Sequence, residues 1–424
     1  MGRAAGAVEE SWSIAPNAPA TVRIFPTLTG VALCISCIVL VEPAPVDAVV
    51  LALFACGIVF GIVRVGQMPV LPVLFLAGLA LANIISIPAS EDPQRALWYC
   101  FVTLYMMMSW ALFVGVMDFY GMSILKTMFR GYSLAACLSV ILAVGSYFHI
   151  IGFQSILLLN GRPKGLFKDP NVFGPFLILI AVLAISGCLP IANRRAQLGT
   201  AIAASLGIAL SYSRACWINY AVSLVLFVLL DQLLPSRVAG SRSSSLPRLF
   251  GLTLLAILVI ALVLQIPSVR TMLAMRLGQG GVQGYDQLRF ETQRLAVQAA
   301  IDHPLGIGPG QSEGVFRYAT HSSYIRVLSE NGLFGLFCFA GFLLATLVQA
   351  ITKACTAPSP QQRGIFVAAA ACLCGHLINS GVVDTVHWRH LWFLFALPWA
   401  QGSVVVAQRT ADRLLLLNCQ EGGA

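Results

Sequence analysis

The sequence predicts an all-α polytopic membrane protein with about twelve transmembrane helices. Of its 424 residues, 58% are hydrophobic and only 10% are charged, whereas a soluble domain carries about 25% charged residues. A helical span needs about 20 apolar residues, so a dozen spans would use roughly 240 residues, close to the hydrophobic share of this chain. The composition therefore excludes a set of ordinary soluble domains.

Apolar runs give the positions of the twelve spans, with ends uncertain by several residues. The spans are expected near 24–41, 46–64, 68–89, 98–117, 131–152, 172–192, 198–212, 215–234, 250–267, 333–351, 365–384 and 389–407. The seventh and eighth come from one apolar stretch of about 37 residues, which is too long for one span. We divide this stretch at residues 211–214.

The distribution of charge supports this topology with the amino terminus inside. The inner segments hold 14 Lys or Arg residues against six acids, a net +8, and the outer segments hold 12 against 11, a net +1. The expected order is a cytoplasmic tail (1–23), nine spans (24–267), a large periplasmic loop (268–332), three spans (333–407) and a second cytoplasmic tail (408–424). The first 23 residues lack the apolar core of a cleavable signal, so the first span is expected to be an uncleaved anchor.

The large outer loop is too long for a simple connection and should contain structure of its own. Residues 285–301 contain helix formers without Gly or Pro, and Asp302, His303 and Pro304 end the predicted helix. Arg289, Gln293 and Ala296 would lie on one face of this helix. A glycine-rich turn at residues 306–310 follows it.

Several kinds of site are not expected. The chain has 12 Cys residues but no CxxC pair, and most of the cysteines lie in or beside apolar runs, where they pack as small apolar side chains. The glycine turn lacks the Lys-Ser/Thr of a phosphate loop, which argues against a nucleotide site. Asp384, His387 and His390 lie close together, and a metal site there is a minority interpretation. His376 in the eleventh span is more often a packing residue. We therefore predict no metal, no cofactor and no nucleic-acid partner.

Basic residues in the outer segments are clustered, which indicates an anionic ligand. Arg162, Lys164 and Lys168 precede the sixth span, and Asn171 is placed to cap the helix that follows, where phosphate binds favourably. A solvated loop with a Pro/Asn turn explains this segment equally well. Arg214 lies at the membrane surface, where an arginine is costly unless it faces a cavity or pairs with an anion. It could instead extend to the lipid headgroups.

The third cluster lies in the large loop. Arg289 and Arg294 can bind a diphosphate through paired hydrogen bonds. His321 and Tyr324 follow them in the sequence. A histidine with a pKa of about 6.5 can take a proton from a sugar hydroxyl. A lone loop histidine is usually not functional, but the surrounding arginines favour a role here.

An ordered series of these residues resembles the bacterial O-antigen ligase family, which also includes polymerases of O-antigen and exopolysaccharide repeat units. The series is Gly165-Leu166-Phe167-x-Asp169-Pro170-Asn171-x-Phe173-Gly174, Ser213-Arg214, Arg289, His303-Pro304-Leu305-Gly306-x-Gly308, His321 with Tyr324, and Glu330-x-Gly332-Leu333-x-Gly335. The motifs cover residues 160–350, and the span number and the long late loop extend the resemblance to the whole chain.

The resemblance implies a GT-C-like glycosyltransferase of the bacterial inner membrane. Such an enzyme moves a glycan from undecaprenyl diphosphate to an acceptor hydroxyl on the periplasmic side, without nucleotide or metal. By position, Arg214 and Arg289 correspond to the arginines that bind the donor diphosphate, and His321 corresponds to the catalytic histidine. Arg162, Lys168, Asn171, Arg294 and Tyr324 are secondary candidates for anion binding. The family usually has Asn after the histidine, whereas Ser322 stands here, which changes the hydrogen bonding around the base.

The leading hypothesis is a ligase that uses lipid A-core as the acceptor. A polymerase that uses a second lipid-linked repeat unit has the same fold, donor and base. A transporter or flippase of lipid-linked sugars would need ionisable residues deep in several spans, and nearly all charges lie outside the spans. A structural membrane subunit leaves the outer arginines unexplained.

Overall fold

The computed structural model describes residues 20–191, 193–237, 284–316 and 318–400, with a few residues between 265 and 274, and these are almost entirely helical. The predicted all-α fold class is confirmed. The helices are α1 (Ala20–Ile35), α2 (Pro45–Val59), η1 (Val65–Gln67), α3 (Val70–Ser86), η2 (Ile87–Ala89), α4 (Pro93–Tyr120), η3 (Gly121–Ser123), α5 (Ile124–Tyr147), α6 (Gln154–Leu157), α7 (Pro170–Ser186), α8 (Arg194–Leu210), α9 (Arg214–Leu233), α12 (Gly284–Asp302), α13 (Ser312–Val315), α14 (Ser323–Thr356), α15 (Pro360–Ser380), α16 (Arg389–Ala396) and η4 (Leu397–Trp399). One antiparallel ribbon joins β1 (Leu158–Leu159) to β2 (Arg162–Pro163).

The chain is a multi-pass membrane protein by the length and apolarity of its helices. In the described part of the chain, five helical ranges are long and apolar enough to cross a membrane: Val70–Ala89, Pro93–Tyr147, Arg214–Leu233, Ser323–Thr356 and Pro360–Ser380. The second range contains both α4 and α5, which Gly121 separates at a φ of 68°. Helices α1, α2 and α7 are apolar but shorter. The total of twelve stays a prediction, because residues 250–264 of the expected ninth span and the end of the last span lie outside the described residues.

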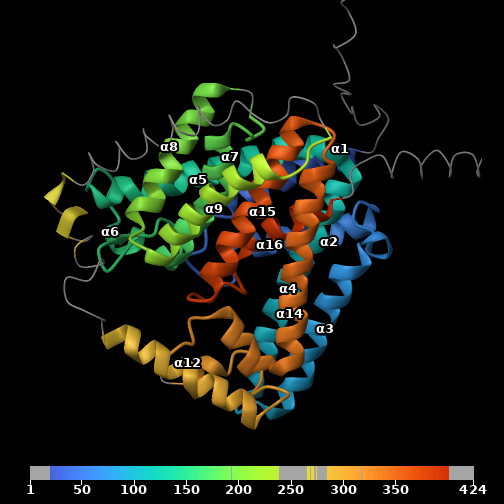
Figure 1. Cartoon of the computed structure of the whole chain (residues 1–424), viewed down its shortest axis with the longest axis vertical. Helices are drawn as coiled ribbons and strands as arrows, with labels where there is room; N and C mark the ends of the chain where they lie inside the picture. The colour runs from blue at the N-terminus through green and yellow to red at the C-terminus, as the bar shows by residue number, and fades with distance from the viewer. Residues whose placement is uncertain are drawn as a thin grey trace, which may run out of the picture.

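The core of the bundle forms around α7 and the helices near the carboxyl terminus. Residues 176–183 of α7 are all buried, as expected for a helix that is apolar on every side. The Tyr132 hydroxyl of α5 donates to the Phe176 carbonyl at 2.7 Å, and Phe393 of α16 packs edge-on against Tyr132. Figure 1 shows α15 and α16 in the middle of the molecule, surrounded by the other helices.

Helices α9 and α15 pack closely and antiparallel, and contacts near both ends set their alignment. Near one end, Asn219 and His376 are hydrogen-bonded at 3.1 Å. Near the other end, the Arg363 guanidinium donates to the Asp231 carboxylate, and both side chains are buried. A Cβ on Gly375 would lie 2.3 Å from the Asn219 amide oxygen, so only glycine permits this approach.

The division of the long apolar stretch is confirmed. Helix α8 ends at Leu210 and α9 begins at Arg214. Tyr212 has a φ of 51°, in the left-handed region, and the Ser213 hydroxyl caps α9 by accepting from the Cys216 amide at 3.4 Å. This tight turn reverses the chain between two packed helices.

The end of the large loop differs from the prediction. Helix α12 matches the predicted helix 285–301, and it lies across one end of the bundle (Figure 1). Helix α14, however, begins at Ser323, ten residues before the expected span at 333. The chain bends at Gly332, where φ is 69°. The first turns of α14 are polar, and a polar sequence at this position predicts a loop. They are helical because the Ser322 side chain caps the helix and their charged residues form ion pairs within the protein.

We predict that the Asp231–Arg363 pair is required for stability. Replacing Arg363 by Gln leaves a buried carboxylate without its cation, which costs about 3–5 kcal/mol. Thermal unfolding of the purified protein in detergent should show a clearly lower midpoint, and the paired change Asp231→Leu with Arg363→Met should recover most of the loss. A midpoint equal to that of the unmodified protein in the single variant would contradict this role.

Candidate functional site

His321 lies in the short connection between α13 and α14. Its φ of 48° is in the left-handed region, which costs a non-glycine residue about 1–3 kcal/mol and is typical of functional sites. Both neighbours are buried, Thr320 and Ser322 each at 2% exposure. Gln293 of α12 donates to the Thr320 carbonyl at 2.9 Å, and Ser322 caps α14. The strained backbone at His321 is thus held on both sides.

The electrostatics of the site favour the neutral form of His321. Burial lowers the pKa of His321 below its ordinary value of 6.5, and the positive charge of Arg289 lowers it further. The carboxylates of Asp384, Asp169 and Glu313 act on the same ring in the opposite direction. A neutral imidazole can accept a proton at neutral pH. Arg289 and His321, predicted separately, are therefore close enough to interact.

Arg289 is positioned by α12. Its guanidinium donates to the Val382 carbonyl in the connection between α15 and α16. Gln293 lies one turn further along the helix, and Ala296 is fully buried against Ile307 and Phe316. The predicted face of Arg289, Gln293 and Ala296 is therefore the face that docks onto the protein. Arg294 lies on the exposed side of the same helix.

Arg214 begins α9 and is exposed. Because α9 and α15 are antiparallel and Asn219 lies opposite His376, Arg214 and the end of α15 come to the same end of the helix pair. Val382, where Arg289 docks, follows that end of α15 by two residues. The two predicted donor-binding arginines therefore lie at the same end of the bundle.

Arg162 and Asn171 support the turn that carries Arg214. The Arg162 guanidinium, buried at 8% exposure, donates twice to the Ser211 carbonyl at 2.9 and 3.1 Å and once to the Asn171 side chain at 3.1 Å. The expectation that Asn171 caps α7 is wrong. Asp169 is the cap, since its carboxylate accepts from the Asn171 amide at 2.6 Å; aspartate is among the preferred capping residues.

The other two secondary candidates also have protein partners. Lys168 pairs with Glu42 at 2.8 Å, and both side chains are about half exposed. The Tyr324 hydroxyl donates to the Leu377 carbonyl at 2.8 Å, which ties the start of α14 to the end of α15.

The structure adds a buried charge cluster around Arg326 that the sequence analysis did not select. Arg326 donates to Asp384 and pairs with Glu330 at 3.2 Å and Glu313 at 3.4 Å. Its guanidinium also lies 4.9 Å from the centre of the Tyr99 ring. Arg326 and Glu330 stand four residues apart on a polar segment, a helical pairing signal that could have identified half of this cluster.

The cluster determines the charge state of the connection between α15 and α16. Burial alone raises the pKa of the Asp384 carboxyl, but Arg326 and then His387 hold it below its ordinary value. Burial and the charge of Arg326 lower the pKa of His387 to about 4. His387 also shares a hydrogen bond of 3.1 Å with the Thr103 hydroxyl. Asp384 is therefore a fixed negative charge within electrostatic reach of His321.

The glycine turn packs against α14. Ile307 and Gly308 donate backbone hydrogen bonds to the Ser329 and Glu330 carbonyls at 2.9 and 3.0 Å. The Glu330 carboxylate accepts from the Gly310 amide at 2.7 Å. A Cβ on Gly306 would lie 2.2 Å from the Glu330 carbonyl oxygen. The two glycine motifs of the sequence are therefore one packing unit that fixes the loop before His321.

Asp384, His387 and His390 remain close in sequence without being gathered into a group of potential ligands. Within the described residues, no group of three or more His, Cys, Asp or Glu side chains could hold a metal ion. His376 instead bonds to Asn219 inside the bundle.

Residues 199–340 match a family model whose description is O-antigen ligase. No curated protein matches the chain. The matched segment contains Arg214, Arg289 and His321, so the resemblance predicted from the motifs is confirmed. This part of the chain is therefore similar to O-antigen ligases, which supports a function of the O-antigen ligase or polymerase type.

We predict that Gly332 cannot be replaced without loss of stability. Its φ of 69° is unfavourable for other residues, and a Cβ would lie 2.1 Å from the Pro304 carbonyl oxygen. Gly332→Ala should lower the unfolding midpoint and increase protease cleavage near residues 303–313. Gly66→Ala, where a Cβ meets nothing within 4 Å, is the control and should behave like the unmodified protein. Equal behaviour of the two variants would contradict the packing unit.

Proposed function

We propose that this chain, through its segment similar to O-antigen ligases, moves a glycan from undecaprenyl diphosphate to a hydroxyl of lipid A-core at the periplasmic face of the bacterial inner membrane. The observation that carries the proposal is the pairing of a neutral, strained histidine with an arginine on the facing helix. A base next to a cation is what attack on a diphosphate-activated sugar requires.

The proposed reaction is a single displacement. The acceptor hydroxyl gives its proton to His321 as its oxygen bonds to the anomeric carbon of the donor sugar. The bond between this carbon and the diphosphate oxygen breaks, and the electron pair leaves with undecaprenyl diphosphate. Because the donor is already activated, the protein has to align the two substrates and stabilise the leaving group.

Arg214 and Arg289 are proposed to bind the leaving diphosphate. A guanidinium can bind two phosphate oxygens at once, and its charge is retained at every relevant pH. The antiparallel alignment of α9 and α15 supports this role, since it brings Arg214 to the end of the bundle where Arg289 docks. The arginines also supply positive charge at the diphosphate, so transfer is proposed to need no metal.

The secondary candidates divide into two groups. Arg162 and Asn171 hold the turn before Arg214, and Tyr324 joins two helices, so these three are proposed to position the site. Lys168 forms an ion pair with Glu42, so a substrate anion would have to compete with this carboxylate. Arg294 lies on the exposed face of α12 and is the best of the five for direct contact with an anionic substrate.

A polymerase with the same donor is the second candidate. The matched domain fits both types, and only the acceptor differs. Purified protein should be given an undecaprenyl diphosphate glycan with either lipid A-core or a second lipid-linked unit, with and without a chelator. Product on lipid A-core supports the ligase and product on the second unit supports the polymerase. Transfer to neither acceptor would overturn the proposed function.

We predict that His321→Ala abolishes transfer and leaves donor binding intact, because the base is lost and the arginines remain. His149→Ala is a matched control, since His149 is an exposed histidine that also has a left-handed φ, 59°. Transfer is measured with labelled donor, and binding by retention of donor on the immobilised protein. Loss of binding together with turnover would show that His321 positions the donor instead.

We predict that two replacements of Arg289 have different effects on the pH profile. Arg289→Lys keeps the charge and loses the bidentate contact, so transfer should fall at an unchanged pH dependence. Arg289→Gln also removes the charge that lowers the pKa of His321, so the pH below which kcat/KM declines should move upward. Identical profiles for the two variants would show that Arg289 does not act on the base.

A further inference from the structure

A large cleft in the described part of the chain is lined by neither Arg214 nor Arg289, the arginines proposed to bind the diphosphate. It has a volume of about 970 Å³ and lies between the connection from α1 to α2, the first turns of α4, the segment before α7, and the connection from α15 to α16. These segments lie at the ends of the expected spans that the charge distribution assigns to the outer side. We therefore expect the cleft to open at the outer surface of the membrane.

The wall of this cleft carries cations that already have carboxylate partners. Arg389 binds Asp47 through two hydrogen bonds of 2.6 Å. Arg326 is surrounded by Asp384, Glu313 and Glu330, and Lys168 pairs with Glu42. A diphosphate would have to compete with these acids for each cation. The part of the cleft next to these ion pairs is therefore better suited to an uncharged sugar than to a phosphate group.

The remaining lining is apolar and aromatic. Trp98, Phe101 and Tyr105 follow one another at helical spacing on α4 and line the cleft. At its edge, Leu51, Trp98 and Phe101 are 50%, 54% and 64% exposed, which in a membrane protein means contact with lipid. An apolar chain can enter sideways from the bilayer, and aromatic side chains next to fixed polar groups suit a sugar.

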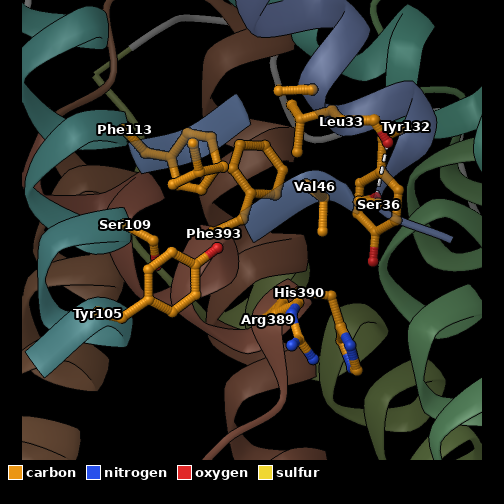
Figure 2. Close-up of a pocket in the computed structure, with 12 residues that line it drawn as sticks. Leu33, Ser36, Val46, Tyr105, Ser109, Phe113, Tyr132, Arg389, His390 and Phe393 are labelled. Atoms are coloured by element: carbon orange, nitrogen blue, oxygen red, sulfur yellow. Dashed lines mark hydrogen bonds between the residues drawn. The ribbon is translucent and has the colours of Figure 1, made fainter. Parts of the chain in front are cut away.

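Two buried polar atoms without a hydrogen-bond partner among the described residues belong to side chains that line this cleft, Nη2 of Arg326 and Nε2 of His390. His390 is 8% exposed. His390, Arg389, Tyr105 and Ser36 line both the cleft and a smaller cavity further inside, and Figure 2 shows the side chains of Tyr105, Arg389 and His390 close together below Phe393. A buried polar atom without a partner is costly, and a ligand hydroxyl can satisfy it.

We infer that this cleft binds the acceptor glycolipid, with its apolar chain toward the bilayer and an uncharged sugar near His390. The inference rests on the proposed function. It adds that the acceptor and the donor approach His321 from different sides. Asp384 and Glu313 line the cleft and their charges act on His321, so the cleft lies on the side of the proposed base where these two acids stand. The donor diphosphate approaches from the side of Arg214 and Arg289.

The test fills the cleft without changing any residue of the proposed catalytic site. Ala48 lies on α2 in the wall of the cleft, and Ala55 lies two turns further along the helix, outside it; both are exposed. Ala48→Trp should raise the KM for the acceptor by about tenfold, equivalent to roughly 1.4 kcal/mol of binding, and leave the KM for the donor unchanged. Ala55→Trp should match the unmodified protein in both.

The assay is run with lipid A-core and with a second undecaprenyl diphosphate-linked unit, which separates the two sources of a glycolipid acceptor. If the unmodified protein transfers to one of them and Ala48→Trp leaves its KM unchanged, or raises the KM for the donor instead, the cleft is not the acceptor site. If the unmodified protein transfers to neither, the proposed function itself fails. As a second variant, Phe101→Ala should weaken acceptor use relative to Phe337→Ala, an exposed phenylalanine of similar accessibility on α14.

Discussion

The buried guanidinium of Arg326 holds together the segments that form the candidate site. It meets Glu313 from the loop after the glycine turn, Glu330 from its own helix, and Asp384 from the connection between α15 and α16. The three acids belong to segments that are separate in the sequence. The Glu330 carboxylate in turn binds the backbone of the glycine turn. One cation therefore determines how the loop, α14 and the last helices fit together.

The free-energy cost of burying the Arg326 charge explains why several acids surround it. A charge taken out of water loses several kcal/mol of hydration, and good geometry with several partners is needed to offset the loss. Arg326 has three carboxylates and an aromatic ring around it. Three acids around one cation leave negative charge, part of which acts on His321 through Asp384 and Glu313. The interaction that organises the loop thus also tunes the proposed base.

Much of the fold follows from the sequence because apolar length and turn chemistry act locally. The division between α8 and α9, the helix α12 and its docking face could be predicted from periodicity, from Ser213 and from Pro304. The pairing of Arg326 with Asp384 could not, since the residues are 58 positions apart and no local pattern links them. The start of α14 was missed for the same reason: its polar first turns are stable only because distant partners satisfy their charges. The prediction that Asn171 caps α7 is wrong because both Asp and Asn are preferred capping residues. The sequence alone does not show which of Asp169 and Asn171 stands at the helix start.

The same reasoning applies to the site. Arg214, Arg289 and His321 could be selected from sequence because of residue type and the family resemblance, but their arrangement depends on tertiary contacts. Helix α12 makes two of these contacts, from Arg289 to Val382 and from Gln293 to Thr320. The first brings the arginine to the end of α15, and the second supports the backbone before His321. Because both arise from one face of one helix, docking of α12 positions the cation and the base together. A single rigid element therefore sets the spacing between the group proposed to bind the leaving diphosphate and the group proposed to accept the proton.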